Sequence, residues 1–261
     1  MELRAQADHP SALANAALCA ARAGARVLVL RNSVADAIAT QEALEHQRLA
    51  ADEPLLFRVR GLATLHHDDF APEDRVALDR ALEARLGRRA SQRRGCVVVA
   101  AQTRQERDDL DADFLLTDLA PMNVLHRRFR VVHRHREQDP YRVPGFRVAS
   151  AVVLLRDEPI DVRLGLEHEG ELRAEWLGAK PEAEHLRLRF GPLEIRGPFG
   201  SALRELELRT SGVLRDEREP QLEPRDVRID ESARGRVLSF SVGEQRYVYD
   251  RWGLRPAQRR P

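Results

Sequence analysis

The sequence has few cysteines and no long apolar run. Cys19 and Cys96 are too few and too far apart to predict a disulfide framework or a zinc site, so we expect a reducing, cytoplasmic compartment. No segment approaches the roughly 18 uninterrupted apolar residues of a membrane-spanning helix. The opening MELRAQADHP also lacks the pattern of a signal peptide. We therefore expect neither a membrane partner nor secretion.

A dominant charge is missing as well. The 261 residues carry 43 basic and 42 acidic side chains, for a formal charge of +1. A surface that binds polyanions all over is therefore not indicated, and contacts with nucleic acid must come from local clusters. Lys180 is the only lysine, so nearly every cation is an arginine. Arginine suits phosphate, although GC-rich coding produces the same bias.

The first half of the chain alternates helical and strand patterns. Such alternation predicts an α/β fold, a RecA-like parallel sheet with helices on both faces, whose functional groups follow the carboxyl ends of the strands. Ser11 and Ser33 are the expected helix N-caps. The expected strands are 26–30, 55–60, 96–103 and 113–118, closed by ASAVVLL (149–155), and the expected helices are 11–24, 34–50 and 72–86.

The second half has a different pattern. Apolar and polar residues alternate with period two between glycine and proline turns, which predicts half-buried antiparallel strands. We therefore expect two domains, residues 1–156 and a smaller β-rich accessory domain at 157–261. The charged segment at 215–235 lacks periodicity and is expected to be an exposed loop.

Four motifs then carry a resemblance to a known family. They are RVLVLRNSVADAIATQEALE, ATLHHDDFAPEDR, GCVVVAAQT and LLTDLAPMNVLHRRFRVVHRHR, and the tail YDRWGLRP adds to them. In this order and spacing they resemble the second RecA-like lobe of the CRISPR-associated superfamily 2 helicase/nuclease of type I interference systems. The likeness is clear from about residue 10 to 150, moderate in the tail and weak between them.

The resemblance implies a motor that closes two lobes around ATP and Mg²⁺. It also implies single-stranded DNA, a first-lobe helicase or nuclease subunit and a CRISPR surveillance complex as partners. The first lobe would supply a phosphate-binding loop, which needs Gly-Lys followed by Ser or Thr. Lys180 lies between Ala179 and Pro181, so these residues contain no such loop. We therefore expect the chain to be inactive alone and to bind ATP and Mg²⁺ only with a first lobe in trans.

The arginine-rich motif is altered, and two alignments of it are open. The family pattern Gln-Arg-x-Gly-Arg-x precedes His-Arg-His. Without a gap, Arg128 is retained and Val131 replaces the arginine finger. With Val132 as an inserted residue, Arg127 and Arg130 fill the two arginine positions. We favour the ungapped alignment. The resemblance thus makes Arg128 and Arg130 candidate catalytic residues, and Arg127 and Arg128 candidate nucleotide contacts.

The preceding loop, which links nucleotide and DNA in the family, is altered too. The family's Thr-x-Glu-Gln-Ser-Leu-Asp-x-Asp becomes TRQERDDLD, in which Arg107 and Asp108 replace the serine and leucine. Its retained carboxylates, Asp109 and Asp111, are implied nucleotide-binding residues. The residues implied to contact nucleic acid are Arg31, Asn32, Ser33, His66, Gln102 and Thr103.

Simpler interpretations stay open. The segment HRRFRVVHRHR is also compatible with a solvated helix. His133 and His135 lack the spacing of a helical metal site, and we expect no bound metal. HHDD (66–69) is similar to His-Asp nuclease motifs but has no companion ligands in the sequence. Three hypotheses follow: a helicase lobe that works with a first lobe in trans, a non-catalytic nucleic-acid or protein binding module derived from such a lobe, and an unrelated α/β hydrolase or nuclease.

Overall fold

The computed structural model describes residues 2–5, 7–88, 90, 94–101, 109–156, 184–190, 199, 205–210, 221–222, 227–232, 235–242 and 245–257. The chain divides into two compact units. The first contains Met1–Phe57 and Arg80–Ala179, and the second contains Arg58–Asp79 and Lys180–Pro261. The boundary expected at residue 156 stays a prediction, because residues 157–183 lie outside the described part.

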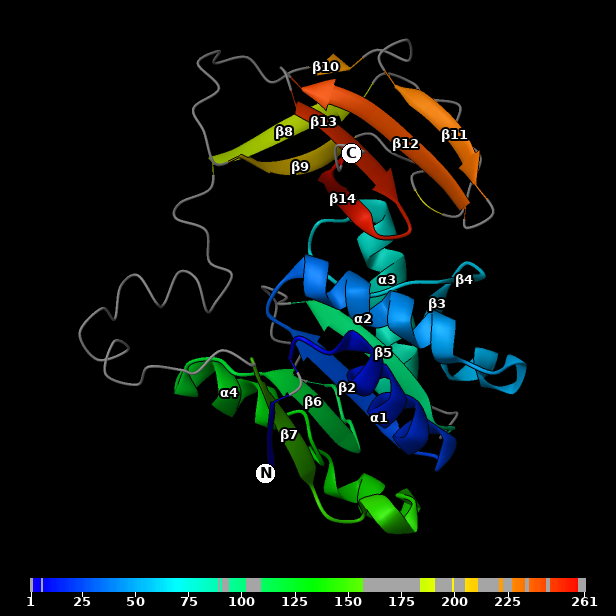
Figure 1. Cartoon of the computed structure of the whole chain (residues 1–261), viewed down its shortest axis with the longest axis vertical. Helices are drawn as coiled ribbons and strands as arrows, with labels where there is room; N and C mark the ends of the chain where they lie inside the picture. The colour runs from blue at the N-terminus through cyan, green and yellow to red at the C-terminus, as the bar shows by residue number, and fades with distance from the viewer. Residues whose placement is uncertain are drawn as a thin grey trace, which may run out of the picture. The chain divides into compact units, whose positions relative to one another are not determined.

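The first unit is built on a parallel sheet of five strands in the order β1-β7-β6-β2-β5 (Figure 1). Its central strands are runs of apolar residues that are buried along almost their whole length, as expected for a sheet covered on both faces. The bounds are β1 Glu2–Ala5, β2 Arg26–Arg31, β5 Cys96–Ala101, β6 Phe114–Asp118 and β7 Ser150–Leu155. The predicted α/β class and parallel sheet are confirmed.

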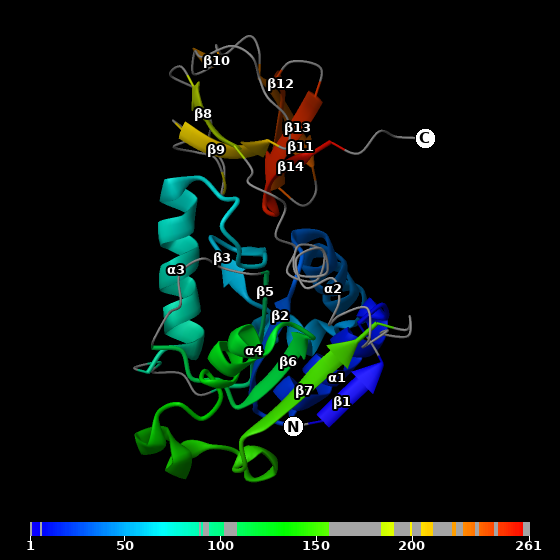
Figure 2. The ribbon, with the colours of Figure 1, turned by 90° about the vertical axis from the view of Figure 1, so that its left-hand side faces the viewer.

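The helices α1, α2 and α4 accompany this sheet. α1 (Pro10–Arg22) and α2 (Val34–Gln47) pack against each other (Figure 2). α4 (Met122–Phe129) packs through Leu125 and the partly buried Phe129 against Val153 of β7. The predicted cap of α2 is confirmed, since the Ser33 hydroxyl accepts a hydrogen bond from the Asp36 N–H. The predicted cap of α1 was wrong: Pro10 begins the helix, so its N-cap is His9 rather than Ser11.

Two strand predictions in this unit need correction. The expected strand at 55–60 is confirmed only in part: Leu55 ends a 3₁₀ helix, Ala50–Leu55, Leu56 forms a single parallel bridge with Val97, and Arg58–Val59 form a short strand. Pro54 lies inside the 3₁₀ helix and lacks a backbone N–H, so it cannot donate a hydrogen bond to a strand ladder. β1 was not predicted, because a four-residue strand has too few positions to display a pattern.

The second unit begins with a small hairpin, β3 (Arg58–Val59) and β4 (Leu62–Ala63), and contains the start of α3 (Pro72–Leu86). The helix has the predicted bounds. Two further sheets follow, in the orders β10-β8-β9 and β11-β12-β13-β14. Their strands are β8 Glu184–Phe190, β9 Glu205–Thr210, β10 Gln221–Leu222, β11 Arg228–Ser232, β12 Gly235–Val242, β13 Gln245–Asp250 and β14 Gly253–Pro256.

The β11 to β14 sheet is antiparallel, as predicted for the second half. The expected exposed loop at 215–235 was partly wrong, because β10 and β11 lie within it. Charged side chains at β11 hid the strand, which lies at the edge of its sheet. The strand expected around 160–166 lies outside the described residues.

Candidate functional site

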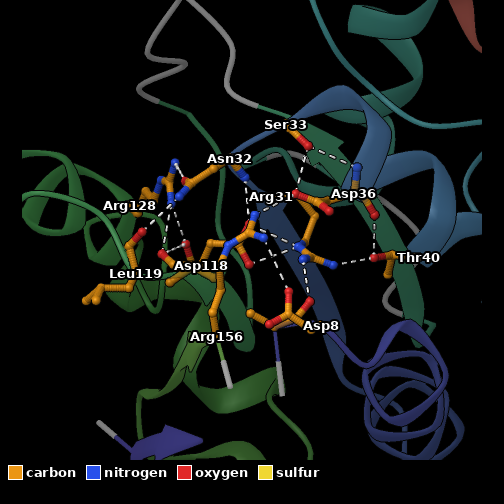
Figure 3. Close-up of polar contacts among 12 residues, drawn as sticks. Asp8, Arg31, Asn32, Ser33, Asp36, Thr40, Asp118, Leu119, Arg128 and Arg156 are labelled. Carbon is orange, nitrogen blue, oxygen red and sulfur yellow. Dashed lines mark hydrogen bonds and ion pairs between the residues drawn. The ribbon is translucent and has the colours of Figure 1, made fainter. Parts of the chain in front are cut away.

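The carboxyl ends of β2, β6 and β7 meet at one edge of the sheet. The parallel register places Leu30 of β2 beside Thr117 of β6, and Asp118 of β6 beside Leu154 of β7. In α/β sheets this edge is the usual location of ligands. Figure 3 shows the polar side chains that gather there, which we call the carboxyl-edge cluster: Asp8, Arg31, Asn32, Ser33, Asp36, Thr40, Asp118, Arg128 and Arg156.

Arg31, a predicted DNA contact, lies at the centre of this cluster and is only 1% exposed. Its Nε lies 2.9 and 3.0 Å from the two carboxylate oxygens of Asp118. Nη1 donates to the Thr40 hydroxyl at 2.7 Å, and Nη2 donates to the Ala7 carbonyl at 2.7 Å. Burial raises the pKa of Asp118, although the Arg31 charge opposes that shift. Separating such a buried pair by removing one partner costs about 3–5 kcal/mol.

Asn32 joins β2 to the segment after β6. Its N–H donates to Asp118 Oδ2 at 2.7 Å, and its side-chain amide donates to the Leu119 carbonyl at 2.8 Å. Its side-chain carbonyl accepts a hydrogen bond from Arg128 Nη2 at 2.9 Å. These three bonds fix the turn that leads to Ser33 and the amino end of α2.

Arg128, the candidate catalytic residue of the ungapped alignment, is 8% exposed. Besides Asn32, its guanidinium bonds the Thr117 hydroxyl at 2.9 Å and the Asp118 carbonyl at 3.1 Å. Burial lowers the pKa of Arg128, and the charge of Asp118 offsets part of that effect. In this structure Arg128 ties α4 to the edge of the sheet.

The two arginines closest to Arg128 in sequence are not buried as Arg128 is. Arg127 and Arg130 are both exposed. α4 ends at Phe129, so the arginine-rich helix expected from the sequence is shorter than predicted. Arg130 is the C-cap, and Ala112 N–H then bonds the Val131 carbonyl at 2.8 Å. Val131 and Val132 therefore follow the helix, and an inserted residue there would not rotate α4.

Asp109 and Asp111, the implied nucleotide ligands, lie before β6 and not after it. Five residues of β6 separate Asp111 from the carboxyl edge, a span of about 16 Å at the usual rise of a strand. Asp109 is exposed, whereas Asp111 is completely buried. The structure does not bring these carboxylates to Arg128.

The sequence did not indicate the ion-pair network that holds Asp111. Arg142 Nη2 lies 2.9 Å from Asp111, and Arg142 Nη1 lies 2.5 Å from Asp113. Arg26, the first residue of β2, reaches Asp111 at 2.9 Å. Burial alone would raise the pKa of Asp111, but the hydrogen bonds and charges of Arg142 and Arg26 hold it below its ordinary value. Because Arg26 and Arg142 lie far from the acidic residues in sequence, spacing alone could not pair them.

His66, another predicted DNA contact, belongs to the second unit, whereas Arg31, Asn32 and Ser33 belong to the first. His66 is 3% exposed. Its Nε2 lies 2.8 Å from Asp79 Oδ1. The adjacent His67 donates from Nε2 to the Trp252 carbonyl at 2.8 Å, while its Nδ1 accepts the Asp69 N–H at 3.0 Å. Burial lowers the pKa of His67 to about 4. A neutral imidazole that uses both nitrogens in this way anchors the chain.

The tail that resembles the family packs on this same histidine segment. Tyr249 O–H donates to Asp74 at 2.5 Å and accepts the Ala71 N–H at 3.1 Å. Gly253 has φ +74°, and a Cβ there would lie 2.7 Å from the Asp69 carbonyl oxygen. Two motifs that are far apart in sequence are therefore one packed structure, in which only glycine fits at 253.

Two other findings complete the site. Gln102 and Thr103, predicted DNA contacts, lie outside the described residues. Arg156, which no motif singled out, lies just past β7 with a side chain that is 62% exposed.

Among the described residues, no helix is long and apolar enough to cross a membrane, and no three His, Cys, Asp or Glu side chains are grouped to hold a metal ion.

The comparisons of this sequence with known proteins all point to proteins of one family. Residues 23–137 match the family described as "CRISPR-associated nuclease/helicase Cas3, C-terminal". The Escherichia coli K12 CRISPR-associated endonuclease/helicase Cas3 is 29% identical over 140 residues, which are 54% of this chain and 14% of that protein. Its Thermus thermophilus counterpart is 34% identical over 79 residues, which are 30% of this chain and 9% of that protein.

The fold matches as well. The crystal structure of T. fusca Cas3 with AMPPNP has a TM-score of 0.65 at 16% identity, over 94% of this chain and 40% of that one. A chain in a pre-nicking CRISPR RNA-guided surveillance complex gives 0.60 at 16% identity, over 88% of this chain and 40% of that one. The chain thus spans about a seventh of the first curated relative. It is homologous to the C-terminal region of the Cas3 family of CRISPR-associated nuclease/helicases.

Proposed function

We propose that this chain is the second motor lobe of a Cas3-type DNA helicase and works with a first lobe that lies outside these 261 residues. In this role the carboxyl edge faces single-stranded DNA through the turn at Asn32 and Ser33. The exposed arginines at the carboxyl end of α4 face a nucleotide held mainly by the first lobe. ATP and Mg²⁺ are then bound between the two lobes and not by this chain alone.

The observation that carries the proposal is the link between β2 and α4 at the carboxyl edge. Asn32, at the start of the DNA-facing turn, is hydrogen-bonded directly to Arg128 on α4. A motor must connect nucleotide and DNA through groups that move together. Arg128 is better suited to this connection than to catalysis, because all its described bonds are internal. Arg127 and Arg130, which are exposed and fill the two arginine positions of the gapped alignment, are the proposed nucleotide-facing arginines.

Several family members support the assignment by what their structures contain. T. fusca Cas3 structures include complexes named for AMPPNP, ADP and ATP. Another similar chain belongs to a CRISPR RNA-guided surveillance complex. We extend nucleotide, DNA and surveillance-complex binding to this chain as part of the proposal.

A second candidate is a binding module that has lost hydrolysis. Val131, a half-buried residue just past α4, occupies the arginine-finger position of the ungapped alignment. An arginine finger contributes about 10³ to 10⁵ in rate to phosphoryl transfer, so its loss alone would nearly silence turnover. Such a chain would still bind DNA or a surveillance complex.

ATP hydrolysis tests the two candidates. The chain is assayed alone and mixed with a first-lobe fragment of a Cas3 relative, each with and without single-stranded DNA. We expect turnover only in the mixture with DNA. Binding of DNA and first lobe without any turnover would favour the binding module. Turnover by the chain alone would contradict both.

A further inference from the structure

The backbone that leads into Arg156 is fixed at the carboxyl edge from both sides. The Leu154 carbonyl accepts the Leu119 N–H at 3.0 Å, and the Leu155 carbonyl accepts the Ala7 N–H at 2.9 Å. Ala7 is itself held by the buried Arg31, which donates to its carbonyl at 2.7 Å. The last residues of β7 therefore deliver Arg156 to a defined place in the cluster (Figure 3).

The side chain of Arg156 is held much less firmly. Its Nη1 lies 3.3 Å from Asp8 and its Nη2 lies 3.4 Å from Asp36, with 62% of the arginine side chain exposed. Exposed pairs at such distances are weak and are screened by salt. The Arg31 pair with Asp118, by contrast, is short and buried. Of these two arginines, Arg156 is the one that can turn toward an external anion at little cost.

The surroundings suit a phosphate. Asp36 lies in the first turn of α2, so Arg156 reaches the amino end of a 14-residue helix, where the helix dipole adds positive potential. A guanidinium also binds phosphate through paired N–H groups with defined geometry. A phosphate oxyanion would replace the two carboxylates as the partner of Arg156.

We propose that Arg156 is a phosphate-binding residue of the carboxyl edge, restrained by Asp8 and Asp36 and released when a phosphodiester of single-stranded DNA displaces them. The inference rests on the proposed function, in which this edge faces DNA. It replaces the predicted contact at Arg31, whose side chain braces the edge from within. Asp8 and Asp36 thereby weaken DNA binding.

The test is the affinity of the full chain for a fluorescently labelled oligothymidylate, measured by anisotropy over a range of salt concentrations. We expect Arg156→Ala to weaken binding about tenfold and to reduce the slope of log affinity against log salt by about 0.7, the contribution of one phosphate contact on a single strand. Asp8→Asn should strengthen binding about two- to fivefold, because it removes a competing partner of modest strength. If the ion pair between Arg156 and Asp8 had only a structural role, Asp8→Asn would not strengthen DNA binding.

The opposite end of α2 offers matched controls. Arg48, whose side chain is 36% exposed, pairs with Glu53 at 2.5 Å. Arg48→Ala and Glu53→Gln make the same chemical changes about 21 Å along the helix from its start, and we expect neither to change DNA affinity. If Arg156→Ala behaves like Arg48→Ala while the wild-type chain binds the oligonucleotide, the inference fails and the proposed function stands.

Two other outcomes bear on the proposed function and on the source of the phosphate. A wild-type chain that does not bind the oligonucleotide at low salt removes the DNA-binding part of the proposed function, and the inference with it. ATP, tested by competition, identifies the source of the phosphate. We expect ATP to displace the oligonucleotide from neither the wild-type chain nor Arg156→Ala, because this chain alone is not expected to bind ATP. Displacement by ATP from the wild type that is lost in Arg156→Ala would overturn the assignment to DNA.

Discussion

Arg128 provides a sharp test, because the family resemblance and the structure suggest different roles for it. The resemblance makes it a nucleotide contact, whereas its guanidinium lies inside the protein. Arg128→Met keeps the apolar stem and removes the three hydrogen bonds. The matched control is Arg127→Met, one residue earlier on α4 and exposed.

The expected cost follows from those bonds. Removing the guanidinium leaves the Asn32 side-chain oxygen, the Thr117 hydroxyl and the Asp118 carbonyl without this donor. The Thr117 hydroxyl still donates to the Asp118 carbonyl at 3.3 Å. A buried group that loses its hydrogen-bond donor costs about 1–3 kcal/mol, and less where another partner remains. Relief from burying a charge offsets part of this sum, since burial lowers the pKa of Arg128. We expect Arg128→Met to lower the free energy of unfolding by about 3 kcal/mol. We expect Arg127→Met to change it by no more than about 0.5 kcal/mol.

Urea unfolding of the isolated chain, followed by far-ultraviolet circular dichroism, measures both variants. The difference between them matters more than either value, because both remove one positive charge from the same helix. Equal stability of the two variants would refute the structural role of Arg128. Arg128 would then again be a candidate ligand contact.

Three further predictions follow. Because burial lowers the pKa of His67 to about 4 in the folded chain, against about 6.5 when unfolded, the unfolded state takes up the proton first as pH falls. The free energy of unfolding should therefore drop by about 2 kcal/mol between pH 7 and pH 5, and His67→Gln should remove most of that drop. Urea unfolding of both proteins at several pH values measures this effect. An unchanged pH dependence in the variant would contradict the prediction. Gly253→Ala should lower the melting temperature measured by calorimetry, because its φ of +74° and the nearby Asp69 carbonyl leave no room for a Cβ, and a variant as stable as the wild type would disprove the close packing. In the two-lobe ATPase assay, Val131→Arg should raise turnover at least about 10³-fold if the ungapped alignment holds, whereas loss of turnover in Arg130→Ala without that gain would establish the gapped one.

The sheet of the first unit was largely predictable, because its strands are compact apolar runs. RVLVL and CVVVAA admit few alternatives between helices of ordinary length. Ser33 was recognisable as a cap because a serine before a helical pattern has a known local role. The end of α4 was not predictable, since arginine, valine and histidine continue past Phe129 without a glycine or proline to stop a helix.

The candidate site was harder to predict, because burial depends on neighbours that are distant in sequence. Arg31 is the last residue of a strand, where a ligand contact could lie, yet its guanidinium is buried and pairs with Asp118, which is 87 residues away. Arg156 belongs to no motif and reaches the edge only because β7 pairs with β6. Sequence spacing thus placed several candidate residues at the carboxyl edge of the sheet, but it did not indicate which of the arginines there faces outward.

The central claim is that this lobe joins a nucleotide-binding first lobe to single-stranded DNA. The most direct measurement is the affinity of the mixture of this chain and a first-lobe fragment for single-stranded DNA, with and without AMPPNP. We expect AMPPNP to change the affinity of the mixture for single-stranded DNA at least about fivefold, a typical coupling between linked sites, and to leave the affinity of this chain alone unaltered. An affinity of the mixture that does not respond to AMPPNP would contradict the claim.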